Sequence, residues 1–291
     1  MNWDGLVLLN KPQGRTSHSV VQEVRERLNI SKAGHLGTLD PIATGVFPVC
    51  LGKATRLASF YMGADKCYLA AFRFGYFTTT DDREGEPEGP YSKVKFSPEQ
   101  LEKALAGFQG DYVQTPPAFS AKKIKGQKAY QIARKGKKPE LAEQKVKIFD
   151  IRLIHFESDV ATIFIHCGSG TYVRAIARDV GKKLGCGAHV QELSRTRFGP
   201  FSLEQTVAPD APGKEVRSSL IPMDKMLSQF PEVVLDADTS KKVLNGSHIE
   251  LEETVHEEWV RLFNKQKNLL AFAQVITQDG KQRAQPKVVF N

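Results

Sequence analysis

The segment from Gly34 to Gly45, GHLGTLDPIATG, constrains the fold of this chain more than any other. Its three glycines and one proline interrupt helix and strand alike, so the segment is predicted to be a loop. Pro41 restricts the backbone of the residue before it and therefore stiffens the loop around one carboxylate, Asp40. A carboxylate presented in this way can act as nucleophile or base on a bulky substrate. The loop by itself also fits an ordinary Asp-Pro turn with an Asx hydrogen bond, so other parts of the chain must decide.

The composition is that of an ordinary globular protein. With 291 residues, 41% hydrophobic and 25% charged, the chain can form a large core, and we expect one large and one smaller domain. No apolar run approaches a membrane span, and residues 1–5 lack the features of a secretory signal. The four cysteines are widely spaced, which favours reduced thiols and a cytoplasmic location. Neither they nor the seven histidines show metal-ligand spacing, so we expect no metal.

A block of positive charge lies between residues 122 and 147. It contains ten lysines and arginines against two glutamates, Glu140 and Glu143. The aromatic residues Phe119 and Tyr130 lie beside and within the block. Basic groups near aromatic rings suit a polyanion whose bases can stack, so the block favours a nucleic-acid partner. A solvated lysine face or a floppy insert is the alternative.

The hydrophobic pattern predicts strands and helices in irregular order. We expect strands at about 6–9, 67–76, 146–156 and 160–167, and helices at about 20–28, 98–108 and 173–184. Ser17 or Ser19 is the expected cap of the first helix, and residues 78–89 are expected to form a polar acidic loop. This order favours an α+β fold over a doubly wound sheet. Beyond a proline-rich boundary at 208–231, short strand candidates at 233–235, 259–263, 269–276 and 288–290 predict a small β-barrel.

Four patches occur in an order that is typical of one family. They are KPQGRTS at 11–17, HLGTLDPIATG at 35–45, QTPPAFSAKK at 114–123 and GTYVR at 170–174. They resemble the KPxGxTS, HxGTLDPxATG, QxPPxYSAxK and GTYxR elements of the TruB type of tRNA pseudouridine synthase, the pseudouridine-55 synthase. The resemblance extends from about residue 5 to 228. The tail resembles a PUA RNA-binding domain through residues 244–249 and 269–273.

The resemblance implies an α+β pseudouridine synthase fold, with a central mixed, largely antiparallel sheet flanked by helices. Residues 1–228 would form the catalytic domain, with an RNA-gripping insertion at about 114–147. Residues 232–291 would form a PUA-like RNA-binding domain, a small β-barrel. The implied reaction isomerises uridine 55 in the T-loop of tRNA to pseudouridine after the base is flipped out, without any cofactor. The implied partner is the tRNA T-arm and T-loop, with no membrane and no obligate protein partner. Assistance in tRNA folding is compatible with the same surface.

The resemblance also implies three catalytic residues. Asp40 would act at the sugar as a nucleophile or as a stabiliser and base, and both routes stay open. Arg174 would pair with Asp40 and keep it ionised by lowering its pKa, although a surface helix arginine is the alternative. Tyr68, in a DKxY-like element at 65–68, would lie against the target base and take the C5 proton. Without the resemblance, Tyr68 is an ordinary strand aromatic on one face with Phe72 and Phe74.

Further residues would contact the substrate or support the loop. His35 would occupy space vacated by the extruded nucleotides, and Lys11 would support the active-site loop. Tyr172 and Leu193 would line the uracil pocket. The alternatives are a hydrogen-bonded structural residue for His35 and a solvated lysine in a turn for Lys11. Tyr172 and Leu193 could equally be plain core residues. The expected RNA contacts are completed by four lysines of the basic block: Lys122, Lys123, Lys125 and Lys128.

The chain departs from the family pattern at several positions. Phe119 replaces the usual tyrosine of the PPxYSA element, and Ser194 and Arg195 stand where the family often has two arginines. We expect these positions to affect RNA contacts and not to touch the set formed by Asp40, Tyr68 and Arg174. Five glutamates between 250 and 258 make one face of the tail acidic. Two other functions stay open: an RNA-binding or RNA-folding protein without catalysis, and a pseudouridine synthase acting on another RNA.

Overall fold

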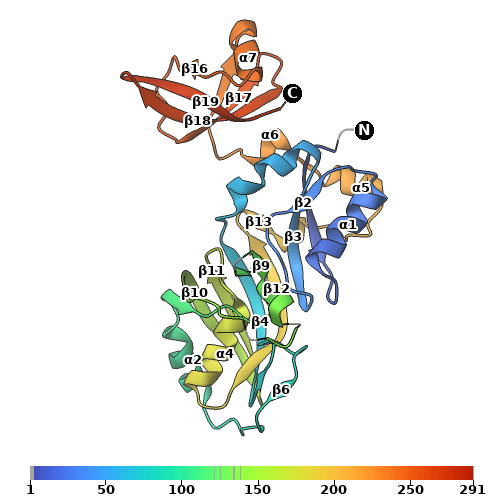
Figure 1. Ribbon diagram of the computed structural model, residues 1–291, viewed down its shortest axis with the longest axis vertical. Coiled ribbons are helices and arrows are strands. Elements are labelled where there is room, and N and C mark those ends of the chain that lie inside the picture. Colours follow the sequence, from blue (N-terminus) through green and yellow to red (C-terminus); the bar gives the residue numbers. More distant parts are fainter. Residues whose placement is uncertain (1–2, 121, 125, 134, 138, 291) are drawn as a thin grey trace.

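The computed structural model describes residues 3–120, 122–124, 126–133, 135–137 and 139–290 (Figure 1). The elements up to the basic block are β1 (Gly5–Lys11), α1 (Ser17–Arg27), β2 (Ala33–His35), β3 (Ala43–Leu51), the 3-10 helix η1 (Gly52–Tyr61), β4 (Lys66–Phe74), β5 (Phe77–Thr78), β6 (Pro87–Glu88), α2 (Pro98–Ala106) and β7 (Gly110–Gln114). The next are β8 (Lys123–Ile124), β9 (Gln127–Lys128), α3 (Ala129–Ala133), β10 (Gln144–Glu157), β11 (Val160–Cys167), α4 (Val173–Lys183), β12 (Ala188–Phe198), β13 (Phe201–Ser202), η2 (Leu203–Gln205), α5 (Gly213–Ser218), β14 (Ile221–Pro222) and α6 (Met223–Met226). The last are β15 (Glu232–Leu235), α7 (Ala237–Leu244), β16 (Ile249–Glu250), β17 (Trp259–Asn264), β18 (Leu269–Gln278) and β19 (Lys281–Val289).

A ten-stranded sheet forms the frame of the larger part of the molecule (Figure 1). Its order is β14-β1-β3-β12-β4-β11-β10-β7, with β2 paired to β3 and β13 to β12. The β3–β12 pair is parallel, and the other pairs in the sheet are antiparallel. The predicted α+β class and mixed, largely antiparallel sheet are therefore confirmed.

Period-two alternation explains how β4 is placed in the sheet. Tyr68, Ala70, Phe72 and Phe74 are all buried on one face, where they join a core that also takes in side chains of α1, α2 and α4. The intervening Leu69 is 40% exposed, so the opposite face of the sheet is open at this strand. The predicted face of this strand is correct, and Tyr68 lies on the side that carries the helices.

Helix α1 begins one residue earlier than the predicted caps allow. The side chain of Thr16 accepts a hydrogen bond from the Ser19 backbone N–H at 3.0 Å, so Thr16 is the N-cap. The prediction of Ser17 or Ser19 is wrong because Ser17 is used elsewhere: its Oγ donates to the Leu39 carbonyl oxygen at 2.8 Å. This serine thereby joins the start of α1 to the loop that carries Asp40.

The C-terminal strands form a separate five-stranded sheet, curled and ordered β15-β17-β18-β19-β16. Predicted strands at 233–235, 259–263 and 269–276 match β15, β17 and β18, and the strand expected at 288–290 is the end of a longer β19. Helix α7 was not predicted. This sheet packs on η1, where the Phe60 ring meets the rings of Trp259 and Phe272 edge-on at 4.8 and 4.6 Å.

Candidate active site

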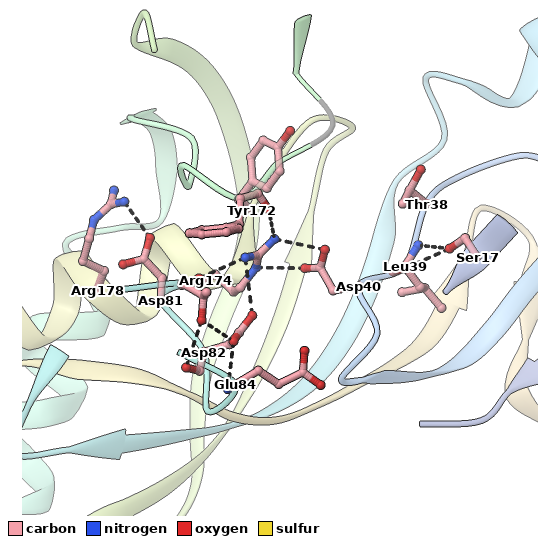
Figure 2. Close-up of polar contacts among 12 residues, drawn as sticks. Ser17, Thr38, Leu39, Asp40, Asp81, Asp82, Glu84, Tyr172, Arg174 and Arg178 are labelled. Carbon is pink, nitrogen blue, oxygen red and sulfur yellow. Dashed lines mark hydrogen bonds and ion pairs between the residues drawn. The ribbon is translucent and has the colours of Figure 1, made fainter. Parts of the chain in front are cut away.

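The loop that carries Asp40 lies between β2 and β3 and is anchored along its length. Leu39 exchanges two hydrogen bonds with the Ser17 hydroxyl, both at 2.8 Å (Figure 2). The Gly14 N–H donates to the Pro41 carbonyl at 2.8 Å, and the Gln13 side chain donates to the Ile42 carbonyl at 3.2 Å. The patch at residues 11–17 is therefore the cradle of the Asp40 loop, and the loop is more than an isolated Asp-Pro turn.

Asp40 faces Arg174, the second residue of α4, in a two-point ion pair. Arg174 Nε lies 2.9 Å from Asp40 Oδ2, and its NH2 donates to Asp40 Oδ1 at 3.0 Å (Figure 2). Arg174 also donates to the carbonyls of Thr80 at 2.9 Å and Phe119 at 3.0 Å. The Arg174 side chain is 3% exposed, whereas Asp40 keeps 31%. The arginine thus fixes the carboxylate from behind and leaves its other side open.

Two further carboxylates stand behind this pair, and the sequence reasoning missed both. Asp82 Oδ2 lies 3.4 Å from Arg174 NH1, and Asp81 Oδ2 lies 2.9 Å from Arg178 NH1 (Figure 2). Burial alone would lower the pKa of Arg174, but Asp40, Asp82 and Asp81 together hold the pKa above its usual value. Burial raises the pKa of Asp81 to about 6, against the opposing effect of Arg178. The adjacent aspartates directly after β5, in the stretch assigned to a polar loop, were the available signal.

A cavity of about 540 Å³ opens in front of Asp40. Its wall also includes Tyr68 on β4, Ala58 of η1, Met62 and the loop at 169–173. Tyr68 is 7% exposed, and burial raises the pKa of its hydroxyl to about 12. The volume lies within the usual range for small-molecule sites, and the wall combines apolar side chains with a few polar groups.

Three of the predicted pocket residues also line this cavity: His35, Tyr172 and Leu193. His35 packs its ring 5.4 Å from that of Phe47, and its Nδ1 has no hydrogen-bond partner among the described residues. Burial and Arg195 lower the pKa of His35, so its ring is neutral near pH 7. The backbone N–H of Tyr172 is held by the Gln114 side chain at 3.0 Å, which joins two of the sequence patches.

Lys11 lies behind the loop and does not line the cavity. Its side chain is fully buried, and Nζ donates to the carbonyls of Pro12, Pro41 and Ala43 at 2.9, 3.3 and 2.7 Å. Burial lowers the pKa of Lys11 to about 8, although Asp40 acts in the opposite direction. With its three contacts made to the backbone, Lys11 supports the loop.

The expectation that Phe119 and Arg195 stay clear of Asp40, Tyr68 and Arg174 is wrong. The Phe119 carbonyl accepts a hydrogen bond from Arg174. Arg195 lines the cavity, and its guanidinium donates to the carbonyls of Gly37 and Thr38, within the loop itself. The parallel pairing of β12 with β3 brings Arg195 there, and a pattern search within β12 alone could not reveal it.

Of the four predicted RNA-contact lysines, the structure describes the side chain of Lys122 alone, and Lys122 is not among the residues that line the cavity. Lys122 is exposed, and its Nζ donates to the Gln144 side chain at 2.8 Å. Lys123 and Lys128 pair through their backbones in the β8–β9 hairpin. Lys125 lies outside the described residues. The structure thus leaves the roles of these four lysines as a prediction.

The described residues contain neither a cluster of metal ligands nor a helix that could cross a membrane. No group of three or more His, Cys, Asp or Glu side chains in this part of the chain could hold a metal ion. No helix in it is long and apolar enough to cross a membrane.

Comparison with known proteins gives a consistent family match. Residues 25–173 match the TruB family pseudouridylate synthase N-terminal domain, and residues 174–228 match the tRNA pseudouridylate synthase B C-terminal domain. A tRNA pseudouridine synthase B from Solibacter usitatus is 44% identical over 248 residues, which cover 84% of this chain and 85% of the relative. The Thermotoga maritima protein of the same name is 39% identical over 93% of this chain and 89% of its own.

The fold also occurs in more distant solved structures. A chain of an H/ACA RNP bound to a substrate RNA containing 2'-deoxyuridine superimposes with a TM-score of 0.73, at 24% identity. The match covers 99% of this chain and 86% of the other. A chain of a Cbf5-Nop10-Gar1 complex gives the same TM-score and identity, with 99% and 84% coverage. At this identity the likeness concerns the fold.

Proposed function

The chain belongs to the TruB family of pseudouridylate synthases, and from this premise we propose that it converts uridine 55 in the T-loop of tRNA to pseudouridine. The protein is an isomerase that acts on uridine in tRNA. We assign the synthase activity to residues 1–228 and RNA binding by a PUA-like unit to residues 232–291. A tRNA-modifying enzyme of this kind works where tRNA matures, and we place it in the cytoplasm.

The observation that carries the proposal is the geometry around Asp40. Asp40 is a partly exposed carboxylate that a buried arginine, Arg174, holds at two points. It faces a cavity whose wall also includes the largely buried Tyr68. In the reaction the N1–C1′ bond of uridine breaks, the uracil turns, and a C5–C1′ bond forms. The C5 proton is lost and a proton ends on N1, so no electrons enter or leave. Attack by Asp40 at the sugar or the base, and proton abstraction by it at the sugar, all begin from its ionised form.

The other residues take roles that follow from their positions. Arg174 holds and aims the carboxylate, because its two contacts fix both oxygens. Tyr68 takes the C5 proton, from a place on the same cavity wall. His35, Tyr172 and Leu193 contact the flipped nucleotide and its neighbours through the cavity they line. Residues 114–147 grip the T-arm through their basic block, and these contacts offset the cost of unstacking the base.

The proposal is tested by Asp40→Asn on a pre-folded T-arm minihelix carrying tritium at C5 of the target uridine. An amide cannot act as a charged nucleophile or base, so we expect single-turnover tritium release to fall by at least about a thousandfold, with RNA affinity retained. Asp150→Asn is the matched control, because Asp150 has a similar side-chain exposure of 35% and pairs with Arg152 instead. Near-normal tritium release by Asp40→Asn would refute the role of Asp40. If the wild-type protein formed pseudouridine at another position of tRNA instead, the assignment to uridine 55 would be wrong.

A further inference from the structure

Arg195 is buried without a carboxylate partner among the described residues. It is 1% exposed, less than Arg174 at 3%. Its Nε donates to the Val46 carbonyl at 2.8 Å, NH2 to Gly37 at 3.1 Å, and NH1 to Thr38 at 3.5 Å. A buried charge that meets only neutral acceptors is costly, and burial lowers the pKa of this arginine. Such an arrangement needs a reason beyond packing.

The position of Arg195 in the sheet supplies that reason. On β12 it pairs with Gly45 of β3 on one side and with Tyr68 of β4 on the other. Gly45 is the third residue of β3, the strand that follows the Asp40 loop, and a Cβ there would lie 2.2 Å from the Arg195 carbonyl oxygen. Arg195 therefore stands between the strand that leaves the Asp40 loop and the strand that carries Tyr68.

We propose that Arg195 is a positioning residue for the isomerisation, which holds the Asp40 loop and Tyr68 in one fixed frame. The inference rests on the proposed function. The three carbonyls it binds bracket Asp40, with Gly37 and Thr38 before it and Val46 after it. Lys11 holds the loop separately, at Pro41 and Ala43. Without Arg195 the loop thus keeps its place in the fold, while the direction of the carboxylate relative to the base relaxes.

The same guanidinium acts on Tyr68. Arg195 and Tyr68 are direct neighbours across the β12–β4 pair, and both line the cavity. Burial raises the pKa of Tyr68, and the charge and hydrogen bond of Arg195 partly counter this rise. The charge of Arg195 thus reduces the cost of ionising the tyrosine, and the ionised form is the one that would accept the C5 proton.

The test compares Arg195→Lys with Arg197→Lys on the C5-tritiated minihelix. Lysine keeps the charge but cannot reach three carbonyls, and misplacement by about 1 Å can cost about a hundredfold. We expect the saturated single-turnover rate of Arg195→Lys to fall about ten- to a hundredfold, with the RNA dissociation constant changed less than threefold. Arg197 follows on the same strand beyond a β-bulge and pairs with Asp65, so its variant keeps the wild-type rate.

Two further measurements separate positioning from folding. Arg195→Ala, which leaves a space beside the cavity, should regain part of its rate with millimolar methylguanidinium and none with urea. In a double-mutant cycle with Tyr68→Phe, the losses should be less than multiplicative, because both changes remove one contact. A wild-type saturated rate in Arg195→Lys would overturn the proposal, as would a loss that only follows the folded fraction, or fully multiplicative losses. An inactive wild type would instead count against the proposed function.

Discussion

Exposure separates the roles of the acidic side chains around Arg174. Asp40 keeps 31% of its side-chain surface and can meet a substrate, whereas Asp82 keeps 6% and can meet only its neighbours. Asp82 also accepts hydrogen bonds from the Thr80 hydroxyl at 2.5 Å and from the Glu84 N–H at 3.1 Å. One buried guanidinium is thus balanced by two carboxylates, the partly exposed Asp40, which we propose to be reactive, and the buried Asp82. The second keeps Arg174 in place when substrate covers the first.

Lys11 gives the site a titration near pH 8 with opposite effects on stability and rate. Its folded pKa of about 8 lies below the unfolded 10.5, so between these values the unfolded chain binds more protons. Stability due to this group therefore rises with pH in that window and is lost as pH falls through 8. The saturated rate should fall over the same range, because a neutral amine has two N–H donors for three carbonyls.

The measurement is the difference in unfolding free energy between wild type and Lys11→Met, followed from pH 7 to 10. Lys66, whose pKa burial also lowers to about 8, is present in both proteins and cancels. The unfolding free energy of wild type minus that of Lys11→Met should rise with pH. If this difference stays constant or falls between pH 7 and 10, Lys11 does not titrate in that range.

At the scale of elements, local patterns predicted β1, β4, α2, β10, β11 and α4, but β12 was not predicted. Its sequence, AHVQELSRTRF, alternates only in part, because bulges break its register with β4 twice. Asp40 and Arg174 could be paired from the sequence through the resemblance. The places of Asp82 and Arg195 could not be predicted in this way. Asp82 reaches the site through the turn after β5, and Arg195 reaches it through the pairing of β12 with its neighbouring strands.

Gly45 is where two elements meet too closely for a side chain. Its φ is +102°, and a Cβ would lie 2.2 Å from the Arg195 carbonyl oxygen. Gly45→Ala should therefore lose more than the roughly 1–3 kcal/mol of backbone strain alone. Gly14→Ala is the control: its φ is +78° with open space around the missing Cβ, so it shows the strain alone. Equal losses of unfolding free energy in denaturant titrations would mean that the close approach of β3 and β12 is unimportant.

The basic block is the element expected to hold RNA. Changing Lys122, Lys123, Lys125 and Lys128 to Gln should weaken minihelix binding and flatten its salt dependence. Each lost phosphate contact lowers the log–log slope by about 0.9 units or less. The saturated rate should change far less than in Asp40→Asn. As a charge-matched control, the exposed Lys93, Lys95, Lys103 and Lys182, which lie outside both the basic block and residues 232–291, are changed together. An unchanged slope in the first variant, or an equal loss in the control, would contradict a specific grip by this block.

At the scale of the whole molecule, positive charge and the C-terminal sheet are separated. Residues 232–291 contain eight lysines and arginines against nine acidic residues, a net charge of −1, so the rest of the chain carries +9. The C-terminal part therefore does not attract RNA through net charge. Its link to the site is mechanical: η1 presents Phe60 to the C-terminal sheet, while Ala58 and the following Met62 line the cavity.

Phe60→Ala should loosen the C-terminal sheet from η1. The variant removes two edge-on ring contacts, each worth about 0.5–1.5 kcal/mol, and leaves the stacked rings of Trp259 and Phe272 open to water. Trp259 is one of two tryptophans, so in a Trp3→Phe background its emission should shift to the red and protease cleavage within 208–231 should quicken.

Full tRNA should lose more affinity than the minihelix, since the C-terminal part can reach RNA beyond the T-arm only when it is docked. Phe156→Ala, which breaks a stacked pair with Phe96 within the catalytic part, is the control and should leave the emission unchanged. Unchanged emission and cleavage in Phe60→Ala would show that the C-terminal sheet is held by other contacts, such as the Arg261 hydrogen bonds to the Asp224 and Phe230 carbonyls at 2.9 Å.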